Sequence, residues 1–430
     1  MNNYPIGSFL IVGGLDRLVH DLLLSGRIVS GMSFAAIGLL GAIATRSFGG
    51  DRVDGVFAAA CVLGFCYLVA PAWIMVDDPQ TLGEAVMLGA LVVYRSGSRH
   101  RLGLLLAALL VVSGGFIKHN LIAIPLAITL DLGLRSPRKL LFWLGSCAGF
   151  AAVLLGLTQL VAGGAFIEHL LSPRNFTWYG SRYHAMKYLR LFKFPLIAIT
   201  VFSPWIFTGR RIVLAAWGAL SIAAATVLSG FEGTSYNTFQ DAAVFLGIAA
   251  GVLFCELRKR ICRREMQGRL AAVVFGAPAL VLAQPIFARS PDAFRQVYNV
   301  RTLLDHDRNA QREFLSEARF IAERPGPAIC ESLLLCYTAG KPFILDPFNS
   351  RQYILAGRLD QRELIRRIAA HEFAVIQLRG DICDDPTTKE CHILHSRRKF
   401  NRFTDETLYA IDRYYQIARR SQDGTFYVAK

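Results

Sequence analysis

The chain has 430 residues, of which 53% are hydrophobic and 18% charged, and its mean hydropathy is +0.38. A soluble protein of this length carries less apolar sequence, so the composition indicates a membrane protein with several spans. The formal net charge of +15 would suit nucleic-acid binding in a soluble domain, but here much of the arginine and lysine lies in short clusters between apolar segments. Such clusters orient spans in a bilayer. We therefore expect the lipid bilayer, and no nucleic acid, as a partner.

The first 27 residues differ from the rest of the N-terminal half. They carry neither a basic start nor a small-residue cleavage site, which excludes a secretory signal peptide. Asp16, Arg17, His20 and Asp21 fall on one side of a helical pattern, and apolar residues fill the other side. This pattern predicts an amphipathic helix in the membrane interface, so 1–27 is expected to be an interfacial segment.

Apolar segments long enough to span most of a bilayer follow from residue 28 onward. They cover about 28–45, 53–73, 80–94, 102–117, 121–134, 140–162, 192–208, 212–230, 241–257 and 268–286. The sequence therefore predicts an α-helical polytopic membrane domain over 28–286, with about ten transmembrane helices.

Basic clusters occupy every second turn between these segments, and they are Arg46 to Arg52, Arg95 to Arg101, Arg135 to Lys139, Gly209 to Arg211 and Arg258 to Arg264. The positive-inside rule places these connectors in the cytoplasm, as in a bacterial inner (plasma) membrane. The alternate turns and everything after about residue 287 are then extracytoplasmic. Most of the polar side chains of the turns fall on that outer side.

Residues 287–430 have a different pattern, in which apolar runs typical of strands alternate with helical segments. The expected helices are Val297 to Glu323, Gln361 to His371 and Asp405 to Ser421, and the strand-like runs are Ala328–Leu334, Phe343–Leu345, Phe373–Leu378 and Gly424–Ala429. This alternation predicts a C-terminal soluble α/β domain, which the topology places outside the cytoplasm.

Four cysteines lie in this C-terminal domain: Cys330, Cys336, Cys383 and Cys391. In an extracytoplasmic compartment they can pair in three ways. Alternatively, Cys391 with His392, His395 and nearby aspartates provides metal-ligand chemistry, although the spacing matches no standard site.

Two clusters of ionisable residues flank spans on the predicted outer face. Asp77 and Asp78 precede an apolar segment, where carboxylates either cap the helix or orient an acceptor or a divalent cation. Lys118, His119 and Asn120 lie between two apolar segments. A lysine there is either an anchor that reaches the interface or the cation that holds a phosphate. Because charged groups at a membrane boundary are costly, both clusters are candidate site residues.

The loop 163–191 interleaves arginines with aromatic residues. Arg174, Arg182, Tyr183 and His184 are suited to holding a phosphate and stacking a sugar, although an interfacial aromatic belt has the same composition. The next outer turn supplies Glu232, Tyr236 and Asn237, which either bind substrate or only form a loop with a helix cap.

The order and sidedness of these features resemble the polytopic glycosyltransferases of the GT-C type (glycosyltransferase family 39-like). That group includes the dolichyl-phosphate-mannose protein mannosyltransferases and the bacterial aminoarabinose transferases. The matching features are Asn3-Tyr4-Pro5 before a surface helix, Arg27 before the next span, Asp77 or Asp78 before a span, Gly115 to Lys118 before a span with Pro125, and the turn Gly233 to Asn237. In the C-terminal domain, Glu331, Tyr337 to Pro342 and Asp346 to Phe348 are similar to the extracytoplasmic domain of bacterial members.

The resemblance implies a membrane glycosyltransferase, with a sugar donor linked to polyprenyl phosphate and an acceptor glycan, lipid or protein in the cell envelope. Lys118, with Arg174 or Arg182, would hold the lipid phosphate, and a carboxylate would act as general base on the acceptor. Family members also carry an acidic residue in an outer loop after an additional first span. We therefore expect such a span and residue to be encoded upstream of Met1.

Two alternatives from other classes stay open at this point. A lipid or solute transporter would place its polar groups near the middle of the bilayer, in broken helices, whereas here they gather at span ends. A truncated relative without the first span would be a non-catalytic membrane scaffold.

Overall fold

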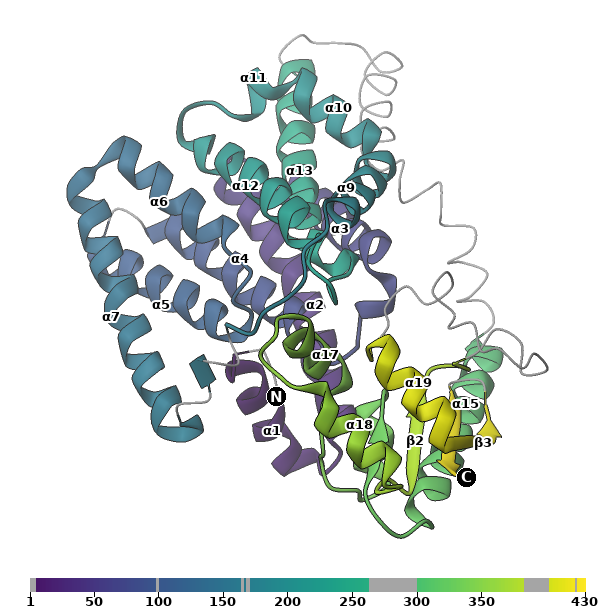
Figure 1. Cartoon of the computed structure of the whole chain (residues 1–430). Helices are drawn as coiled ribbons and strands as arrows, with labels where there is room; N and C mark the ends of the chain where they lie inside the picture. The colour runs from purple at the N-terminus through teal and green to yellow at the C-terminus, as the bar shows by residue number, and fades with distance from the viewer. Residues whose placement is uncertain are drawn as a thin grey trace. The chain divides into compact units, whose positions relative to one another are not determined.

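The computed structural model describes residues 5–97, 100–163, 166–167, 171–262, 300–382, 402–421 and 424–430. The chain forms two compact units (Figure 1). The helical unit comprises Tyr4–Leu170 and Phe176–Asp292, and the C-terminal unit comprises Met1–Asn3, Leu171–Asn175 and Ala293–Lys430. The predicted span at 268–286 lies outside the described residues.

The helical unit begins with α1 (Gly7–Val19), α2 (Leu22–Ser47), α3 (Arg52–Val69), η1 (Pro71–Trp73), α4 (Pro79–Gly97), α5 (Arg101–Ile117), α6 (Ala123–Arg135) and α7 (Pro137–Ala162). It continues with α9 (Trp178–Leu191), α10 (Lys193–Val201), α11 (Ser203–Ile206), η2 (Gly209–Arg211), α12 (Ile212–Leu228), η3 (Tyr236–Phe239) and α13 (Gln240–Cys262). Among the described residues, four helices are long and apolar enough to cross a membrane: Leu22–Ser47, Arg52–Val69, Pro137–Val161 and Tyr236–Arg260. The prediction of a multi-span helical protein is confirmed.

Capping side chains explain where the first helices begin. Asp21 accepts a hydrogen bond from the Leu24 N–H at 3.0 Å, so α2 begins at Leu22 and includes Arg27, earlier than the predicted start at residue 28. Asp51 and Asp54 form a reciprocal capping box at the start of α3. The predicted amphipathic helix is α1.

Two predictions in the middle of the helical unit are wrong. Part of the predicted loop 163–191 is the helix α9, because the Thr177 side chain accepts from the Gly180 N–H at 3.2 Å and caps its first turn. The predicted single span 192–208 is broken into α10 and α11. Pro204 lies in the first turn of α11, where it has no N–H to continue the hydrogen bonds of α10.

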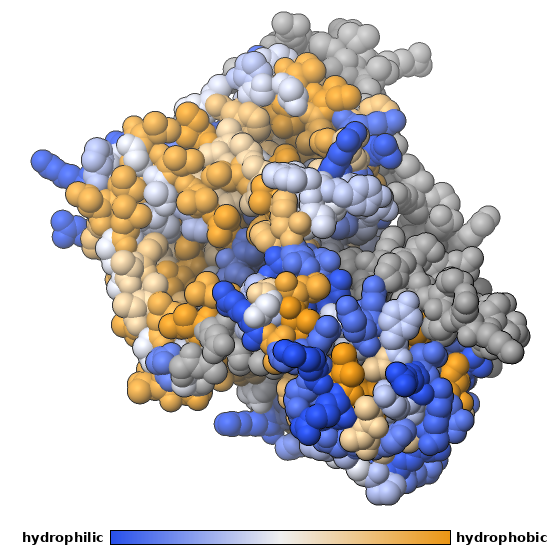
Figure 2. Space-filling view, viewed as in Figure 1, coloured by the Kyte–Doolittle hydropathy of each residue, from blue (hydrophilic) through white to orange (hydrophobic). Residues whose placement is uncertain are grey.

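Helix α13 lies at the centre of the helical unit and α7 lies at its edge (Figure 1). Gly247 and Gly251 of α13 face α3 in the small-xxx-small spacing that lets helix backbones approach closely. A Cβ added at Gly247 would lie 2.7 Å from the Val62 Cα. In contrast, α7 exposes apolar side chains such as Leu141 (70% exposed) and Leu160 (84% exposed), as expected of a helix that faces lipid. Figure 2 shows that apolar residues cover much of the visible face of the helical unit.

The basic connectors contact one another at one end of the helical unit, which we call the basic end. Their side chains donate to backbone carbonyls of other connectors over 2.7–3.0 Å: Arg95 to Ser47, Arg211 to Phe48, Lys259 to Gly49 and Arg135 to Gly209. Arg258 pairs with Asp51 and with the fully buried Asp54. The connectors therefore share one end of the bundle, as their alternation predicts, and the side of the membrane on which they lie stays a prediction.

The C-terminal unit contains α15 (Val300–Ala322), β1 (Ala328–Cys330), α16 (Leu333–Thr338), α17 (Pro347–Leu355), α18 (Gln361–Ala369), β2 (Val375–Leu378), α19 (Asp405–Tyr414), β3 (Tyr415–Arg420) and β4 (Thr425–Ala429). The strand order is β1-β2-β4-β3, in which β1 and β2 are parallel and the other pairs are antiparallel. The prediction of an α/β domain is confirmed.

Some element predictions in the C-terminal unit are wrong. The predicted helix from Asp405 to Ser421 ends at Tyr414, and the remainder is β3, because Tyr415 is buried and the following residues pair with β4. The run Phe343–Leu345 is not a strand, and Leu333 and Leu334 begin α16.

A disulfide joins Cys330, at the end of β1, to Cys336 in α16. This is one of the possible pairings, whereas Cys383, Cys391 and the histidines of the metal alternative lie outside the described residues. The Asp381 carboxylate accepts hydrogen bonds from Arg420 and Thr425.

Candidate functional site

Three segments that are distant in sequence meet at the N-terminal ends of α4 and α13. The Asp78 carboxylate, just before α4, lies 3.8 Å from the Lys118 ammonium in the turn after α5. The Asn237 side-chain amide, in η3 just before α13, donates to the other oxygen of Asp78 at 3.3 Å. The side chains of Asp78 and Lys118 are each only 6% exposed. We call the end of the helical unit that holds these residues the site end.

Local structure fixes each of these side chains. Asp78 caps α4, because its Oδ1 accepts from the Gln80 N–H at 2.7 Å. Lys118 follows the last turn of α5 and donates its N–H to the Gly114 carbonyl at 2.8 Å. Gly83 lets α4 approach this turn closely, since a Cβ there would lie 3.1 Å from the Lys118 Cβ. The capping role proposed for the acidic pair therefore applies to Asp78, which also pairs with Lys118.

A buried cation of this kind is costly unless an opposite charge and hydrogen bonds compensate it. The Asp78 carboxylate supplies the charge, while Gln80 and Asn237 supply hydrogen bonds to that carboxylate. The pair is longer than the 2.7–2.9 Å that is usual for a charge-assisted hydrogen bond. Asp78 therefore supplies an opposite charge that compensates the buried Lys118 ammonium.

Asp77 has a different environment from its neighbour. It is exposed, and its side chain packs beside Gly26 of α2, where an added Cβ would lie 2.6 Å from the Asp77 Cβ. Partial desolvation and the negative charge of Asp78 raise the pKa of the Asp77 carboxyl. Two residues earlier, Met75 adopts a left-handed conformation with φ of 59°, a strained geometry of the kind found at functional sites.

An aromatic cluster borders Asn237. The His184 ring packs edge-on against Tyr236 with centroids 4.7 Å apart, and Tyr183 packs against His184 at 5.5 Å. The Lys187 ammonium lies 3.6 Å from the centre of the Tyr236 ring. His184 Nδ1 donates to the Ser229 carbonyl at 3.0 Å, which fixes α9 on the turn after α12. The aromatic cluster is therefore linked to Asp78 through Asn237, which follows Tyr236 in η3.

Other predicted residues lie apart from these contacts. Arg174 belongs to the C-terminal unit, where its guanidinium lies 5.8 Å from the Phe348 ring centre. Arg182 is exposed on α9. The remaining predicted residues lie in turns at the site end, where His119 is exposed and Asn120 and Glu232 are partly buried.

Sequence reasoning missed a buried pair of carboxyl groups within the helical unit. Glu84 of α4 is fully buried, and among the described residues its two carboxyl oxygens have no hydrogen-bond partner. It interacts electrostatically with Asp241, in the first turn of α13. The Trp217 indole donates to Asp241 at 2.6 Å. The signal was present in the sequence, because an acidic residue inside an apolar span is a candidate functional residue.

Within the ranges that the structure describes, no group of three His, Cys, Asp or Glu side chains is close enough to hold a metal ion. Asp78 is already occupied by Lys118 and Asn237. At the site end, Lys118 is therefore a buried cation paired with Asp78, and Asp77 is an exposed carboxylate. A divalent cation stays a prediction.

Comparison with known proteins identifies relatives by structure only. No protein-family profile and no curated protein sequence matches the chain. The structure is similar to ArnT from Cupriavidus metallidurans bound to undecaprenyl phosphate, with a TM-score of 0.56 and 12% identity over 99% of this chain and 87% of ArnT. The apo state of ArnT gives 0.54 and 13% identity over the same shares of the two chains.

A further similar structure is the Archaeoglobus fulgidus oligosaccharyltransferase tethered to an acceptor peptide. It matches with a TM-score of 0.51 and 11% identity, over 88% of this chain and 61% of that one. At such identities the likeness concerns the fold. The chain therefore has the fold of the GT-C-type membrane glycosyltransferases.

Proposed function

We propose that the protein is a membrane glycosyltransferase that moves a sugar from a polyprenyl-phosphate-linked donor to an acceptor in the cell envelope. The observation that carries the proposal is the buried ion pair of Lys118 and Asp78 at the end of the spans, with the exposed Asp77 adjacent to Asp78 in the sequence. The fold supports the proposal, because ArnT was solved with undecaprenyl phosphate and the oligosaccharyltransferase with an acceptor peptide. The outer face of a bacterial inner membrane is the proposed location.

Lys118 is the proposed phosphate ligand. A polyprenyl chain lies in the bilayer, so its phosphate lies at the level where spans end. The Lys118 ammonium, 3.8 Å from the Asp78 carboxylate, carries the positive charge that would pair with a phosphate oxygen there. As the bond between the sugar and the phosphate breaks, its electron pair passes to the phosphate, and Lys118 stabilises that added charge.

Asp77 is the proposed general base. The acceptor hydroxyl oxygen attacks the anomeric carbon of the sugar while its proton passes to the Asp77 carboxylate. The raised pKa of Asp77 brings its basicity closer to neutral pH, which favours proton transfer in the transition state. Tyr236 and His184 provide ring faces beside the site on which a sugar can stack.

The test measures phosphate release. Membranes that carry the chain are supplied with a radiolabelled pool of polyprenyl-phosphate sugars, and the polyprenyl phosphate produced is quantified. We expect release above that of membranes without the chain, and loss of release in Lys118→Met. Arg190→Met, which removes an exposed cation near the C-terminal end of α9, is the matched control and should retain release. Equal release with and without the chain would contradict the proposal.

A second candidate is a proton-coupled lipid transporter, and the buried Glu84–Asp241 pair is the observation that favours it. A transporter would move the lipid-linked sugar across the bilayer without phosphate release. Glu84→Gln would then stop movement of the lipid, whereas Lys118→Met would leave the amount of polyprenyl phosphate unchanged.

A further inference from the structure

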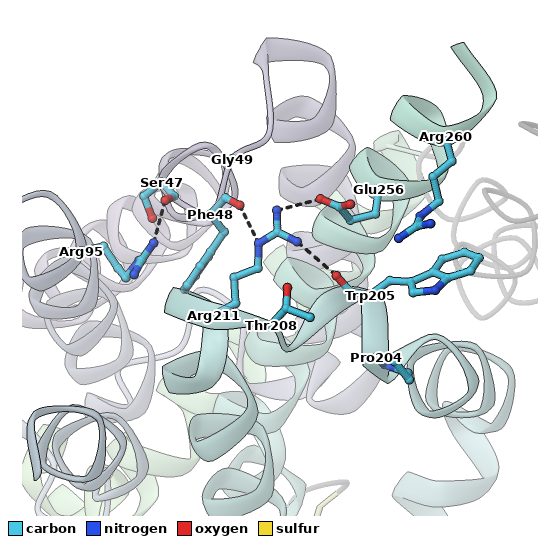
Figure 3. Close-up of a pocket in the computed structure, with 10 residues that line it drawn as sticks. All are labelled: Ser47, Phe48, Gly49, Arg95, Pro204, Trp205, Thr208, Arg211, Glu256 and Arg260. Carbon is cyan, nitrogen blue, oxygen red and sulfur yellow. Dashed lines mark hydrogen bonds and ion pairs between the residues drawn. The ribbon is translucent and has the colours of Figure 1, made fainter. Parts of the chain in front are cut away.

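The basic end of the helical unit contains a pocket of about 400 Å³ that plays no part in the proposed reaction. Figure 3 shows that its wall combines the end of α2 at Ser47–Gly49 with Arg95 of α4, Trp205 of α11 and the arginines Arg211 and Arg260. Four of the five basic connectors therefore contribute to one concave surface. The pocket lies entirely within one compact unit.

The pocket and the candidate site lie at opposite ends of the same helices. Asp78 precedes the N-terminal end of α4, and Arg95 near the C-terminal end of α4 lines the pocket. In the same way, Asn237 precedes α13, and Arg260 near its C-terminal end lines the pocket. With a rise of 1.5 Å per residue, Arg95 lies about 26 Å from Asp78 along α4. The hydrocarbon core of a bilayer is about 30 Å thick. The pocket therefore opens near one membrane surface when the candidate site lies near the other.

Part of the positive charge in this region supports the fold. The last carbonyls of α2, where a helix carries partial negative charge, accept hydrogen bonds from Arg95 and Arg211. Arg211 also donates to Glu256 at 2.7 Å and to the Trp205 carbonyl at 3.3 Å (Figure 3). Arg211 thus joins the C-terminal end of α2 to α11 and α13 through its hydrogen bonds.

The remaining charge is not accounted for by these contacts. Three arginines and one glutamate line the pocket, so positive charge is in excess. Arg260 is exposed, and its guanidinium lies 4.1 Å from the centre of the Trp205 ring. A guanidinium on an indole face at the membrane surface keeps its fork of N–H donors available to an oxyanion.

We propose that this pocket binds the phosphate of an anionic phospholipid headgroup. Basic pockets between membrane helices suit such headgroups at the cytoplasmic surface, where the leaflet is negatively charged and where the basic connectors are predicted to lie. Arginine donors match the geometry of phosphate oxygens, and Trp205 suits the boundary between acyl chains and water. The volume of the pocket is within the range of about 300–1,000 Å³ that is typical of small-molecule sites.

The experiment measures which lipids copurify with the full chain. The protein in detergent is incubated with equal amounts of phosphatidylglycerol and phosphatidylcholine, washed, and its bound lipids are quantified by mass spectrometry. Arg260→Gln removes the exposed pocket arginine, and Arg138→Gln removes an equal charge from an exposed position in the first turn of α7, outside the pocket. A parallel sample contains millimolar inorganic phosphate as a soluble competitor.

We expect phosphatidylglycerol to be retained in preference to phosphatidylcholine. Loss of one charge-assisted contact should weaken its retention by about tenfold in Arg260→Gln, and Arg138→Gln should retain it as the parent does. Equal retention of the two lipids would overturn the proposal. It would also be overturned if both variants lost the lipid equally, which indicates general surface charge, or if inorganic phosphate displaced the lipid, which indicates a soluble anion.

Discussion

The two ends of the helical unit use positive charge in different ways. At the basic end, arginine and lysine side chains donate over 2.7–3.0 Å to backbone carbonyls of neighbouring connectors. At the site end, Lys118 is nearly buried, and its ammonium lies 3.8 Å from the Asp78 carboxylate. A cation with short bonds to the backbone stabilises the bundle. A buried cation paired with a carboxylate is costly to stability and is the phosphate ligand of the proposed function. Under that proposal, structure and reaction are divided between opposite ends of the same helices.

The largest expected effect is at the site end. Asp77→Asn removes the proposed base and should lower the rate of sugar transfer by about 10²–10⁴-fold, the usual contribution of general base catalysis. Because Asp77 is exposed, the thermal unfolding midpoint in detergent should stay close to that of the parent. Retention of transfer activity in a folded Asp77→Asn protein would assign the base elsewhere, with Glu232 and Asp78 as the remaining carboxylates of the predicted site.

At the basic end, the corresponding substitution should act on stability. Arg258→Met removes the partner of the fully buried Asp54 and should lower the free energy of unfolding by about 3 kcal/mol, because a buried charge loses its counter-ion. Arg138→Met, at an exposed connector position, is the matched control and should change it by less than about 0.5 kcal/mol. Denaturant titration in detergent measures both. Equal stability of the two variants would mean that the basic connectors do not stabilise the bundle.

Glycine substitutions in the central helix α13 and the edge helix α7 should differ in their smaller effects on stability. Gly247→Ala places a Cβ 2.7 Å from the Val62 backbone, so α13 must move away from α3. This shift should lower the free energy of unfolding by about 1–3 kcal/mol. Gly156→Ala in α7 meets nothing within 4 Å and should be neutral or gain up to about 1 kcal/mol from helix propensity. The same denaturant titration provides the comparison, and a loss of stability in Gly156→Ala as large as in Gly247→Ala would contradict the central position of α13.

The smallest effect concerns pH. Asp77 acts as a base only when ionised, and desolvation together with the charge of Asp78 raises its pKa. The rate of transfer should therefore fall as the pH is lowered through a pKa above the usual aspartate range, by about tenfold per pH unit below it. A pH profile of kcat/KM measures this. Activity that persists down to the ordinary aspartate pKa would mean that Asp77 is not the base.

The sequence predicts most helices of the helical unit because long apolar segments between basic clusters have few alternatives in a membrane protein. It does not predict α9, whose alternating arginine and aromatic residues lack an apolar face and depend on the Thr177 cap and on packing against the turn after α12. The strand β3 is missed for a similar reason. Its pairing with β4 is a tertiary contact that overrides the helical pattern before it.

For the candidate site, sidedness was the informative signal. Asp78, Lys118 and Asn237 come from three different turns, and only their placement on the same side of the bilayer suggested that they meet. The different roles of Asp77 and Asp78 could not be predicted, because the direction of each side chain depends on Gly26 and on the cap of α4. Glu84 was overlooked, although an acidic residue in a span is itself a signal.

The central claim is that Lys118 binds the phosphate of the donor lipid. The most direct test compares the affinities of undecaprenyl phosphate and undecaprenol for the parent protein and for Lys118→Met and Lys118→Arg, each in nanodiscs. We predict that Lys118→Met weakens binding of the phosphate by about 10–100-fold, the value of a charge-assisted hydrogen bond. Binding of the alcohol should not change, and Lys118→Arg should retain most of the affinity for the phosphate. Equal losses for phosphate and alcohol, or no loss for either, would contradict a phosphate-binding role for Lys118.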